Sequence, residues 1–451
     1  MLKNLKPYQI LLSGYIGVII VGALLLLLPW TRRGSLSLTD AFFTSTSAVC
    51  VTGLIVKDTQ GFFTPVGKGI ILLLLQIGGI GYMTLATFFL FLLRAKSSFS
   101  FRMTMSQSFP ELSIGNIFRF ARLVILITLA LEITGTLILY PSFLKYGFSN
   151  FKAFGHALFT SVSAFCNAGF STFATSLTRY RGDIIINLTV MFLIVVGGIG
   201  FVLLQDIDEK FFLKTKKKLT LHSKAVLIFT TLLIITGAII IFISEYSHGF
   251  AGFPLKEKIL ASLFQAITPR TAGFSTVNMS ILAPSTLYFI MLFMFIGGSP
   301  GGTAGGIKTT TFFGIFIWLY NYLKGNEQII FLKYRISEET IKKIFSIFLL
   351  SIAIIFTSTF LVMVVEREGV KTHGFLPYLF EVFSAFGTVG LSWGSFHHKF
   401  VSLSADFNIP AKWVIIITML AGKVGVLSLA SLIIEKKKEE IGYVPGKYVV
   451  G

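Results

Sequence analysis

Apolar positions in this chain form long runs, which alternate with shorter apolar segments and polar loops in a fixed order. A long run is followed by a short one, then by a glycine-containing stretch, then by another long run. Runs of about 18 or more apolar residues are typical of membrane spans, whereas the short runs cannot cross a bilayer. The order occurs four times and predicts helices over residues 8–28, 41–48 and 69–93; 119–140, 153–166 and 185–205; 223–243, 255–268 and 285–323; 341–365, 376–386 and 411–434.

This pattern predicts an all-α integral membrane protein of eight spans and four re-entrant half-helices. The four pseudo-symmetric helix–pore-helix–helix units are expected to surround one central ion path. Asp40 is the predicted N-cap of the first half-helix. The predicted boundaries are 1–97 for pore unit 1, 98–118 for a cytoplasmic linker, 119–214 for unit 2, 215–325 for unit 3, 326–435 for unit 4 and 436–451 for a cytoplasmic tail.

A short motif follows each half-helix and ends in a glycine at position 53, 169, 273 or 390. Backbone outside a helix is tolerated at membrane depth only when it is buried or lines a wet path. A half-helix that ends there presents carbonyl groups to a cation, and glycine can turn successive carbonyls to one side. Close helix packing by glycine is the alternative for a single copy. Fourfold recurrence favours a K+-binding filter formed by the backbone of Val51, Thr52, Gly53, Asn167, Ala168, Gly169, Thr271, Ala272, Gly273, Thr388, Val389 and Gly390.

A second glycine motif, G-x-x-G, recurs in the last helix of each unit, at 78–81, 197–200, 298–301 and 422–425. Close packing explains the first two copies. The third lies in a segment too rich in glycine and proline to stay helical, which predicts a broken helix and a gating loop below the filter. A nucleotide-binding loop is excluded because Ile307 separates glycine from lysine and no strand precedes the segment. The predicted gating loop comprises Gly297, Gly298, Ser299, Pro300, Gly301, Gly302, Thr303, Ala304, Gly305 and Gly306.

Three of the charged side chains inside the predicted helices and pore segments have a specific interpretation. Lys423 lies too deep to reach water easily, which favours a gating role as a cationic barrier held by loop carbonyls; pairing with backbone alone is the alternative. Arg270 is expected to point behind its loop and to donate to carbonyls at the end of the preceding half-helix. Glu132 has two interpretations, a hydrogen-bonded packing role or a ligand for a coupling ion.

Composition and charge narrow the class of protein. The chain is 54% hydrophobic and 13% charged, with a formal net charge of +19. The excess of Lys and Arg falls on one side of the predicted spans, so the positive-inside rule places both termini in the cytoplasm, and we expect no nucleic-acid partner. The cluster of Lys214, Lys216, Lys217 and Lys218 is a predicted topology anchor near anionic lipid.

Other residue classes carry little chemistry. Cys50 and Cys166 occupy equivalent apolar positions and are expected to pack. The histidines form no metal cluster, and the pair His397 and His398 is expected in a solvated outer loop. A membrane-embedded transferase would need a polar cluster that is not visible, so we expect neither an enzyme nor an organic cofactor.

The strings SAVCVTGL, TPRTAGF, SAFGTVGL, GGSPGGTAGGIKT and YVPGKYVVG resemble the KtrB-type membrane subunits of bacterial Ktr potassium uptake systems, in the Trk/Ktr/HKT superfamily. The resemblance implies K+ conduction across the bacterial cytoplasmic membrane, a homodimer, and a cytoplasmic nucleotide-binding RCK subunit (KtrA-like) that acts on the gate. It also implies a preference for K+ over Na+, since residue 53 is glycine. Lys423 stands where the family commonly has arginine. Two mechanisms stay open, channel-like passage with Na+ as a candidate activator and a Na+- or H+-coupled symporter.

Overall fold

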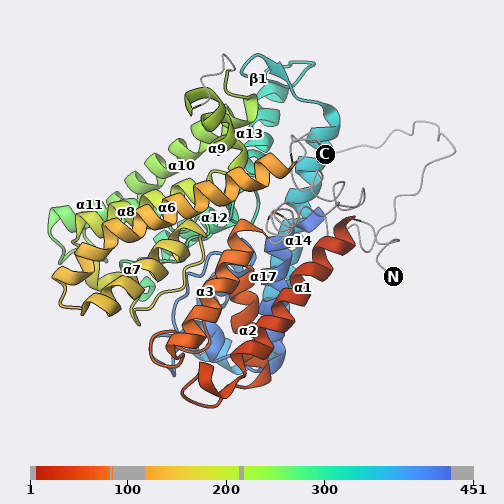
Figure 1. The fold of residues 1–451 in the computed structure, drawn as a ribbon. Coiled ribbons are helices and arrows are strands. Elements are labelled where there is room, and N and C mark those ends of the chain that lie inside the picture. Colours follow the sequence, from red (N-terminus) through yellow and green to blue (C-terminus); the bar gives the residue numbers. More distant parts are fainter. Residues whose placement is uncertain (1–6, 82–83, 85–116, 213–217, 428–451) are drawn as a thin grey trace.

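The computed structural model describes residues 7–81, 84, 117–212 and 218–427. It is helical apart from one short hairpin of β1 (Ile330–Phe331) and β2 (Tyr334–Arg335). The helices are α1 (Pro7–Leu26), α2 (Leu38–Val49), α3 (Pro65–Ile80), α6 (Ile117–Lys145), α7 (Asn150–Phe165), α8 (Ile184–Gly198), α9 (Phe201–Ile207), α10 (Leu221–Glu245), α11 (Leu255–Ile267), α12 (Pro284–Phe295), α13 (Thr309–Leu323), α14 (Glu338–Val365), α15 (Arg367–His373), α16 (Leu376–Gly387) and α17 (Ile409–Val424) (Figure 1).

Four of the described helices are by themselves long and apolar enough to cross a membrane: α1, α6, α10 and α14. They coincide with the first long run of each predicted unit. Each is followed by a shorter helix, α2, α7, α11 or α16, at the place where a half-helix was predicted. The helical class and the alternation of long and short helices are therefore as the hydrophobic pattern indicates.

The start of α2 corrects one detail of the predicted capping. Ser37, not Asp40, is the N-cap, and its hydroxyl accepts the Asp40 backbone N–H at 3.1 Å. Asp40 lies in the first turn, where its carboxylate accepts from Lys412 Nζ of α17 at 2.8 Å. An acidic side chain in the first turn is also favoured by the helix dipole. The Asp40–Lys412 pair ties the beginning of the chain to its last described helix.

The second long helix of units one, two and four ends or bends at a glycine, which corrects the expectation of one continuous helix in each of these units. Residues 185–205 form α8 and α9, which bend by 97° around Gly200. α3 ends at Gly81 and α17 ends at Gly425, although these helices were predicted to extend to 93 and 434. The φ angles of Gly81, Gly200 and Gly425 are +85°, +96° and +91°, a conformation that stops a right-handed helix and that glycine adopts at little cost.

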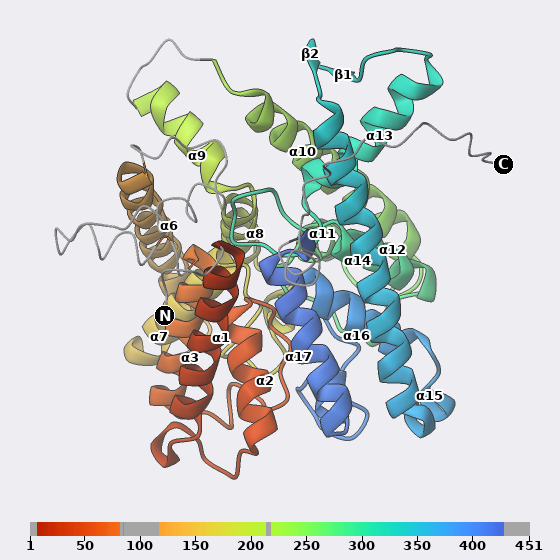
Figure 2. The ribbon, with the colours of Figure 1, turned by 90° about the vertical axis from the view of Figure 1, so that its right-hand side faces the viewer.

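Several predicted segments lie outside the described residues. These are most of the continuation of α3, the residues of 411–434 beyond 427, the linker up to residue 116, the tail 436–451, Lys214, Lys216 and Lys217. The predicted interruption within 285–323 is confirmed, since α12 and α13 are separated by residues 296–308 (Figure 2).

Helix contacts close into a ring, so that segments distant in sequence lie side by side. α3 contacts α7, α8 contacts α11, α12 contacts α16, and α17 contacts α2. Figures 1 and 2 show the consequence, with the blue α17 beside the red and orange α1–α3. The short helices α2, α7, α11 and α16 are thereby held in cyclic order.

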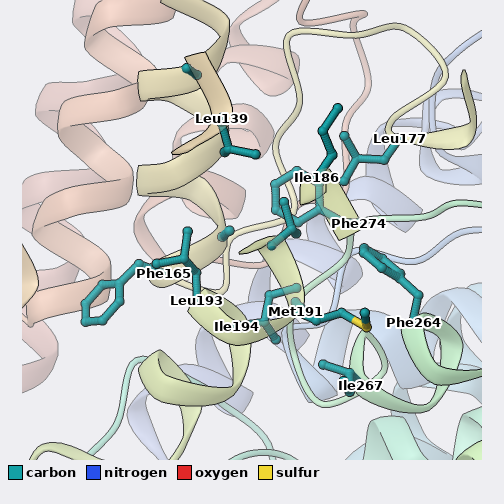
Figure 3. Packing of buried hydrophobic residues seen from close by; sticks show 14 of the residues in the cluster. Leu139, Phe165, Leu177, Ile186, Met191, Leu193, Ile194, Phe264, Ile267 and Phe274 are labelled. Carbon is teal, nitrogen blue, oxygen red and sulfur yellow. The ribbon is translucent and has the colours of Figure 1, made fainter. Parts of the chain in front are cut away.

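A buried apolar cluster supports the second and third short helices. Figure 3 shows Met191 and Ile194 of α8 close to Ile267 of α11, with Phe264 and Phe274 nearby. Phe165 is the last residue of α7, and Phe274 directly follows Gly273. The same packing that joins the helices thus fixes the glycine segments at their ends.

Glycines of the G-x-x-G motifs allow the last helix of a unit to touch the end of a short helix. A Cβ at Gly78, Gly197 or Gly422 would overlap the carbonyl oxygen of Val49, Phe165 or Phe386, respectively. The close packing predicted at 78–81 and 197–200 is therefore confirmed for the first glycine of each motif. The second glycine instead ends the helix.

Replacing Gly197 by alanine should destabilise the protein by about 1–3 kcal/mol, because the added methyl group meets backbone that cannot move aside. Gly155→Ala in α7 is the matched control: a Cβ there meets nothing within 4 Å. It should be neutral or stabilising by up to ~1 kcal/mol. Thermal unfolding of the detergent-solubilised variants measures both. Equal melting temperatures for the two variants would contradict this account of the packing.

Candidate functional site

The four predicted filter glycines meet in one closed ring. A Cβ on any of them would approach the carbonyl oxygen of the residue that precedes the next glycine around the ring. These contacts run from Gly53 to Ala168 at 2.6 Å, from Gly169 to Ala272 at 3.0 Å, from Gly273 to Val389, and from Gly390 to Thr52. Only glycine lets four backbone segments approach this closely, and the ring brings together residues separated by more than a hundred positions in sequence.

The backbone of the four segments alternates in handedness. The residue two positions before each glycine has a positive φ, +50° at Val51, +56° at Asn167, +73° at Thr271 and +50° at Thr388. Each glycine has a positive φ as well, between +68° and +92°, while the residue between them does not. Such alternation turns successive carbonyls toward one side. A left-handed Val or Thr costs roughly 1–3 kcal/mol and persists only where its surroundings impose it.

Hydrogen bonds at the helix ends impose this conformation. In the first segment the Val51 N–H donates to the Ala48 carbonyl at 3.1 Å and the Thr52 N–H donates to the Ser47 carbonyl at 2.7 Å. This is the pattern of a helix that ends on a left-handed residue. The second and fourth segments repeat it. The third differs, because the Ala272 and Gly273 N–H groups both point to the Thr268 carbonyl.

A hydroxyl in each short helix braces the segment that follows it, a role that the sequence analysis missed. Ser47 Oγ accepts from the Gly53 N–H at 3.1 Å, Ser384 Oγ accepts from the Gly390 N–H at 3.0 Å, Ser163 Oγ donates to the Phe170 carbonyl at 2.7 Å, and Thr268 Oγ1 donates to the Phe274 carbonyl at 2.5 Å. The signal was present as a Ser or Thr five or six residues before each glycine.

Glu381 of α16 is a second group that the sequence analysis missed. Its carboxylate is fully buried and accepts from the Ser392 hydroxyl at 2.7 Å, from the Ser404 N–H at 2.9 Å and from the Ser404 hydroxyl at 2.5 Å. Ser392 lies two residues after Gly390. Glu381 therefore anchors the backbone that leaves the fourth glycine segment. A single acid in an apolar helix gives no indication of such distant partners.

All four glycines line a vestibule of about 1000 Å³ on one side of the ring. Its wall also includes the half-buried side chains of Asp58 and Arg181. His397 and His398, which were predicted to lie in a solvated loop, line the wall as well and are exposed. Within the described residues, no group of three or more His, Cys, Asp or Glu side chains could hold a metal ion. The four glycines are thus reached from the vestibule.

Residues 297–306 form a closed loop. Gly297 N–H donates to the Ile307 carbonyl at 2.8 Å, and Ile296 and Ile307 form a bridge at the base of the loop. The loop packs against the bend between α8 and α9. There the Ser299 N–H donates to the Gly198 carbonyl at 2.9 Å, and the Phe201 N–H donates to the Gly301 carbonyl at 2.9 Å. The helix breaks at Gly200 and within 296–308 are therefore parts of one arrangement.

The loop contacts the second and fourth predicted filter segments at their first residues. Thr303 Oγ1 lies 3.1 Å from the side-chain amide of Asn167, and a Cβ at Gly305 would overlap Thr388 Oγ1. The vestibule, in contrast, is lined by the last residues of these segments, the glycines. The loop consequently lies across the ring from the vestibule.

Two lysines hold this loop by its carbonyl groups. Lys423 Nζ donates to the Thr303 carbonyl at 2.6 Å, and Lys308 Nζ donates to the Ala304 carbonyl at 2.6 Å. The Gly306 N–H also donates to the Gly422 carbonyl at 3.2 Å. Both lysines line a cavity of about 150 Å³, together with Gly78, Gly79 and Gly81. Lys308 was not among the predicted gate residues, and its position beside Lys423 follows from the loop closing on itself.

Arg270 and Glu132, the two other charged residues singled out in the sequence, are both buried. The predicted partner of Arg270 is wrong, because Arg270 Nη2 donates to Thr230 Oγ1 of α10 at 3.3 Å rather than to a carbonyl of the half-helix. Glu132 is buried and accepts from the Gln76 amide at 2.9 Å. The Cys166 thiol lies 3.8 Å from the same carboxylate. These hydrogen bonds are those expected for the packing interpretation, and Glu132 lines neither the vestibule nor the cavity.

Comparison with known proteins identifies the family. Residues 6–440 match the TrkH family of cation transport proteins. The chain is 36% identical to Ktr system potassium uptake protein B of Bacillus subtilis, over 99% of this chain and 97% of that protein. It is 32% identical to potassium/sodium uptake protein NtpJ of Enterococcus hirae, over 98% and 96%. The crystal structure of the potassium transporter TrkH from Vibrio parahaemolyticus matches with a TM-score of 0.74 and 20% identity, covering 96% of this chain and 86% of that one. The chain belongs to the TrkH family of cation transport proteins.

Replacing Glu381 by alanine should destabilise the protein by about 2 kcal/mol or more, because three buried donors lose their acceptor. Glu381→Gln keeps an acceptor oxygen and should lose less. The control is Glu368→Ala: this residue is 84% exposed in its side chain and pairs with Lys371 on the surface. Its loss should change stability by less than ~0.5 kcal/mol. Thermal unfolding is the measurement, and a Glu381→Ala variant as stable as Glu368→Ala would contradict the anchoring role.

Proposed function

We propose that this protein takes up potassium ions across the bacterial cytoplasmic membrane by channel-like conduction through the glycine ring. The observation that carries the proposal is the closed ring of four alternating backbone segments, open to the vestibule through its glycines. The names of the most similar relatives, which denote potassium uptake, support K+ as the transported ion. In this proposal the four helix groups are pseudo-symmetric units around one path, as their cyclic contacts favour.

The proposed filter acts through backbone carbonyls rather than side chains. The residues before the glycines differ in chemistry between the four segments, Val51 and Thr52 against Asn167 and Ala168, for example, whereas the backbone angles agree. Carbonyl oxygens that line a narrow path replace the hydration shell of K+. The ends of α2, α7, α11 and α16 add the negative ends of their dipoles at the ring. Glycine at position 53 supports the predicted preference for K+ over Na+.

The proposed gate is the loop 297–306 with Lys423. A loop pressed against the first filter residues blocks the exit of an ion from the ring. The ammonium groups of Lys423 and Lys308 repel a cation in the cavity beyond it. The loop lies in the third helix group and Lys423 in the fourth, the two groups whose G-x-x-G copies depart from the first two, so regulation is proposed to reside where the repeat is broken.

Further proposals concern orientation and partners. The charge bias of the predicted loops supports cytoplasmic termini, with the vestibule facing outward. Relatives named as components of a Ktr system, together with the motif resemblance, support a homodimer controlled by a cytoplasmic nucleotide-binding RCK subunit. We also propose that Na+ activates K+ passage. Coupling to a co-ion at Glu132 is not favoured, because that carboxylate is engaged with Gln76 away from both cavities.

Purified protein in liposomes tests channel-like passage directly. Net K+ flux should reverse at the K+ equilibrium potential, and should not depend on a gradient of Na+ or H+. Gly273→Ala should abolish flux, because its Cβ overlaps the Val389 carbonyl in the ring, whereas Gly252→Ala meets nothing within 4 Å and should conduct normally. Reversal at a potential set by a fixed ratio of K+ to a second ion would instead establish a symporter.

Growth rescue of cells that lack K+ uptake, with and without an RCK subunit, tests the physiological role.

Lys423→Ala should raise basal K+ flux by about threefold or more, because it removes both a hydrogen bond that holds the loop and a positive charge in the cavity. Lys423→Arg retains the charge and should stay close to the unmodified protein. Lys371→Ala, on the exposed surface, is the control for a lost lysine. Rubidium uptake into liposomes measures the change. Unaltered flux and ion dependence in Lys423→Ala would remove this residue from the gate.

A further inference from the structure

Thr303 connects three separate parts of the proposed ion path. Its carbonyl accepts from Lys423 Nζ of α17 at 2.6 Å, and its N–H donates to the Gly197 carbonyl of α8 at 3.3 Å. Its hydroxyl lies 3.1 Å from the amide of Asn167, the first residue of the second filter segment. Both Thr303 and Asn167 are fully buried. One loop residue therefore contacts the filter with its side chain while the Lys423 ammonium holds its backbone.

The Asn167 side chain is bound on every side. When its amide is oriented so that donors meet acceptors, the nitrogen donates to the carbonyls of Ala164 and Ile194, at 3.2 Å and 3.1 Å. The oxygen then accepts from the Thr303 hydroxyl at 3.1 Å and from the Gly198 N–H at 3.2 Å. The end of α7, the end of α8 and the loop thus meet at one filter side chain. A change in loop position alters a bond that fixes Asn167 in its left-handed conformation.

The other three filter segments have no such bond. Val51 has no polar side-chain atom, and the hydroxyls of Thr271 and Thr388 are buried without a hydrogen-bond partner among the described residues. Thr388 touches the loop only by packing against Gly305. Hydrogen bonding between filter and loop is therefore concentrated in the second segment.

We propose that the Thr303–Asn167 hydrogen bond couples the position of the loop to ion binding in the second filter segment. The inference rests on the proposed function, in which the loop is the gate. When the loop leaves its closed position, Thr303 separates from Asn167, and the segment that includes Ala168 and Gly169 loses one of its restraints. By reciprocity, a K+ ion that favours one conformation of this segment must favour one position of the loop.

The variant Thr303→Val removes the hydroxyl but keeps the side-chain shape and the backbone carbonyl that accepts from Lys423. It also removes the contact of this hydroxyl with the Gly197 carbonyl at 3.2 Å, which the double-mutant cycle with Asn167→Ala separates from the coupling. Thr303→Ser restores the hydroxyl and should restore normal behaviour. The matched control is Ser351→Ala, a buried hydroxyl of α14 outside the loop and the filter, whose hydrogen-bond partner is the Ile347 carbonyl of its own helix at 2.7 Å. All variants are compared as full-length protein in liposomes, after their melting temperatures are checked.

The readout is the external K+ concentration for half-maximal uptake, with Na+ as competitor. Thr303→Val should shift this concentration or the Na+ inhibition by about three- to tenfold, the range expected for one hydrogen bond. Thr303→Ser and Ser351→Ala should leave both values unchanged. In a double-mutant cycle, Asn167→Ala should remove most of the effect of Thr303→Val, because both remove the same bond.

Additive effects of Thr303→Val and Asn167→Ala, or unchanged K+ and Na+ dependence in Thr303→Val, would overturn the coupling. If Asn167→Ala does not fold, the comparison of Thr303→Val with Thr303→Ser and Ser351→Ala decides by itself. A different result would refute the gate proposal, namely a basal K+ flux that Lys423→Ala leaves unaltered. Failure of the transport proposal is an absence of K+ flux in the unmodified protein.

Discussion

The architecture depends on one constraint, that peptide groups at membrane depth must find hydrogen-bond partners. Four short helices end inside the bundle, and the backbone continues there without helical bonds. Left-handed residues return the first N–H groups to the helix ends, and the hydroxyls of Ser47, Ser163, Thr268 and Ser384 engage the groups that remain. The glycine of each segment can approach a carbonyl oxygen of the neighbouring segment because glycine carries no side chain. In the proposed function, the carbonyls left over from this arrangement are the ligands of the cation.

The same constraint explains why the broken helices are tolerated. The loop 297–306 has many peptide groups and few side chains, so it takes its partners from neighbours: the end of α8, the Gly422 carbonyl and two lysines. A buried ammonium is costly unless it is hydrogen-bonded, and loop carbonyls provide the partners for Lys423 and Lys308. Loop and lysines are therefore mutually dependent. Movement of the loop away from α17 would remove the acceptor of Lys423.

Sequence reasoning succeeded where the period of the chain carried the information. Hydrophobic run lengths located the long and short helices, and recurrence located the four glycines that form the ring. It failed where the decisive partner is distant in sequence. Glu381, Lys308 and the Thr230 partner of Arg270 gave no local signal. The breaks at Gly81, Gly200 and Gly425 were missed because a single glycine in an apolar run is equally compatible with close packing.

By itself, the sequence determined the membrane class, the fourfold repeat and the positions of the glycine segments and the glycine-rich loop, because these depend on local composition and spacing. Only the tertiary structure decided which atoms meet: that a Cβ at one glycine would strike the next segment, and that Thr303 lies between Asn167 and Lys423. Such contacts arise when helices from different repeats close into a ring. Their geometry is set by packing across the ring, about which local sequence carries no information.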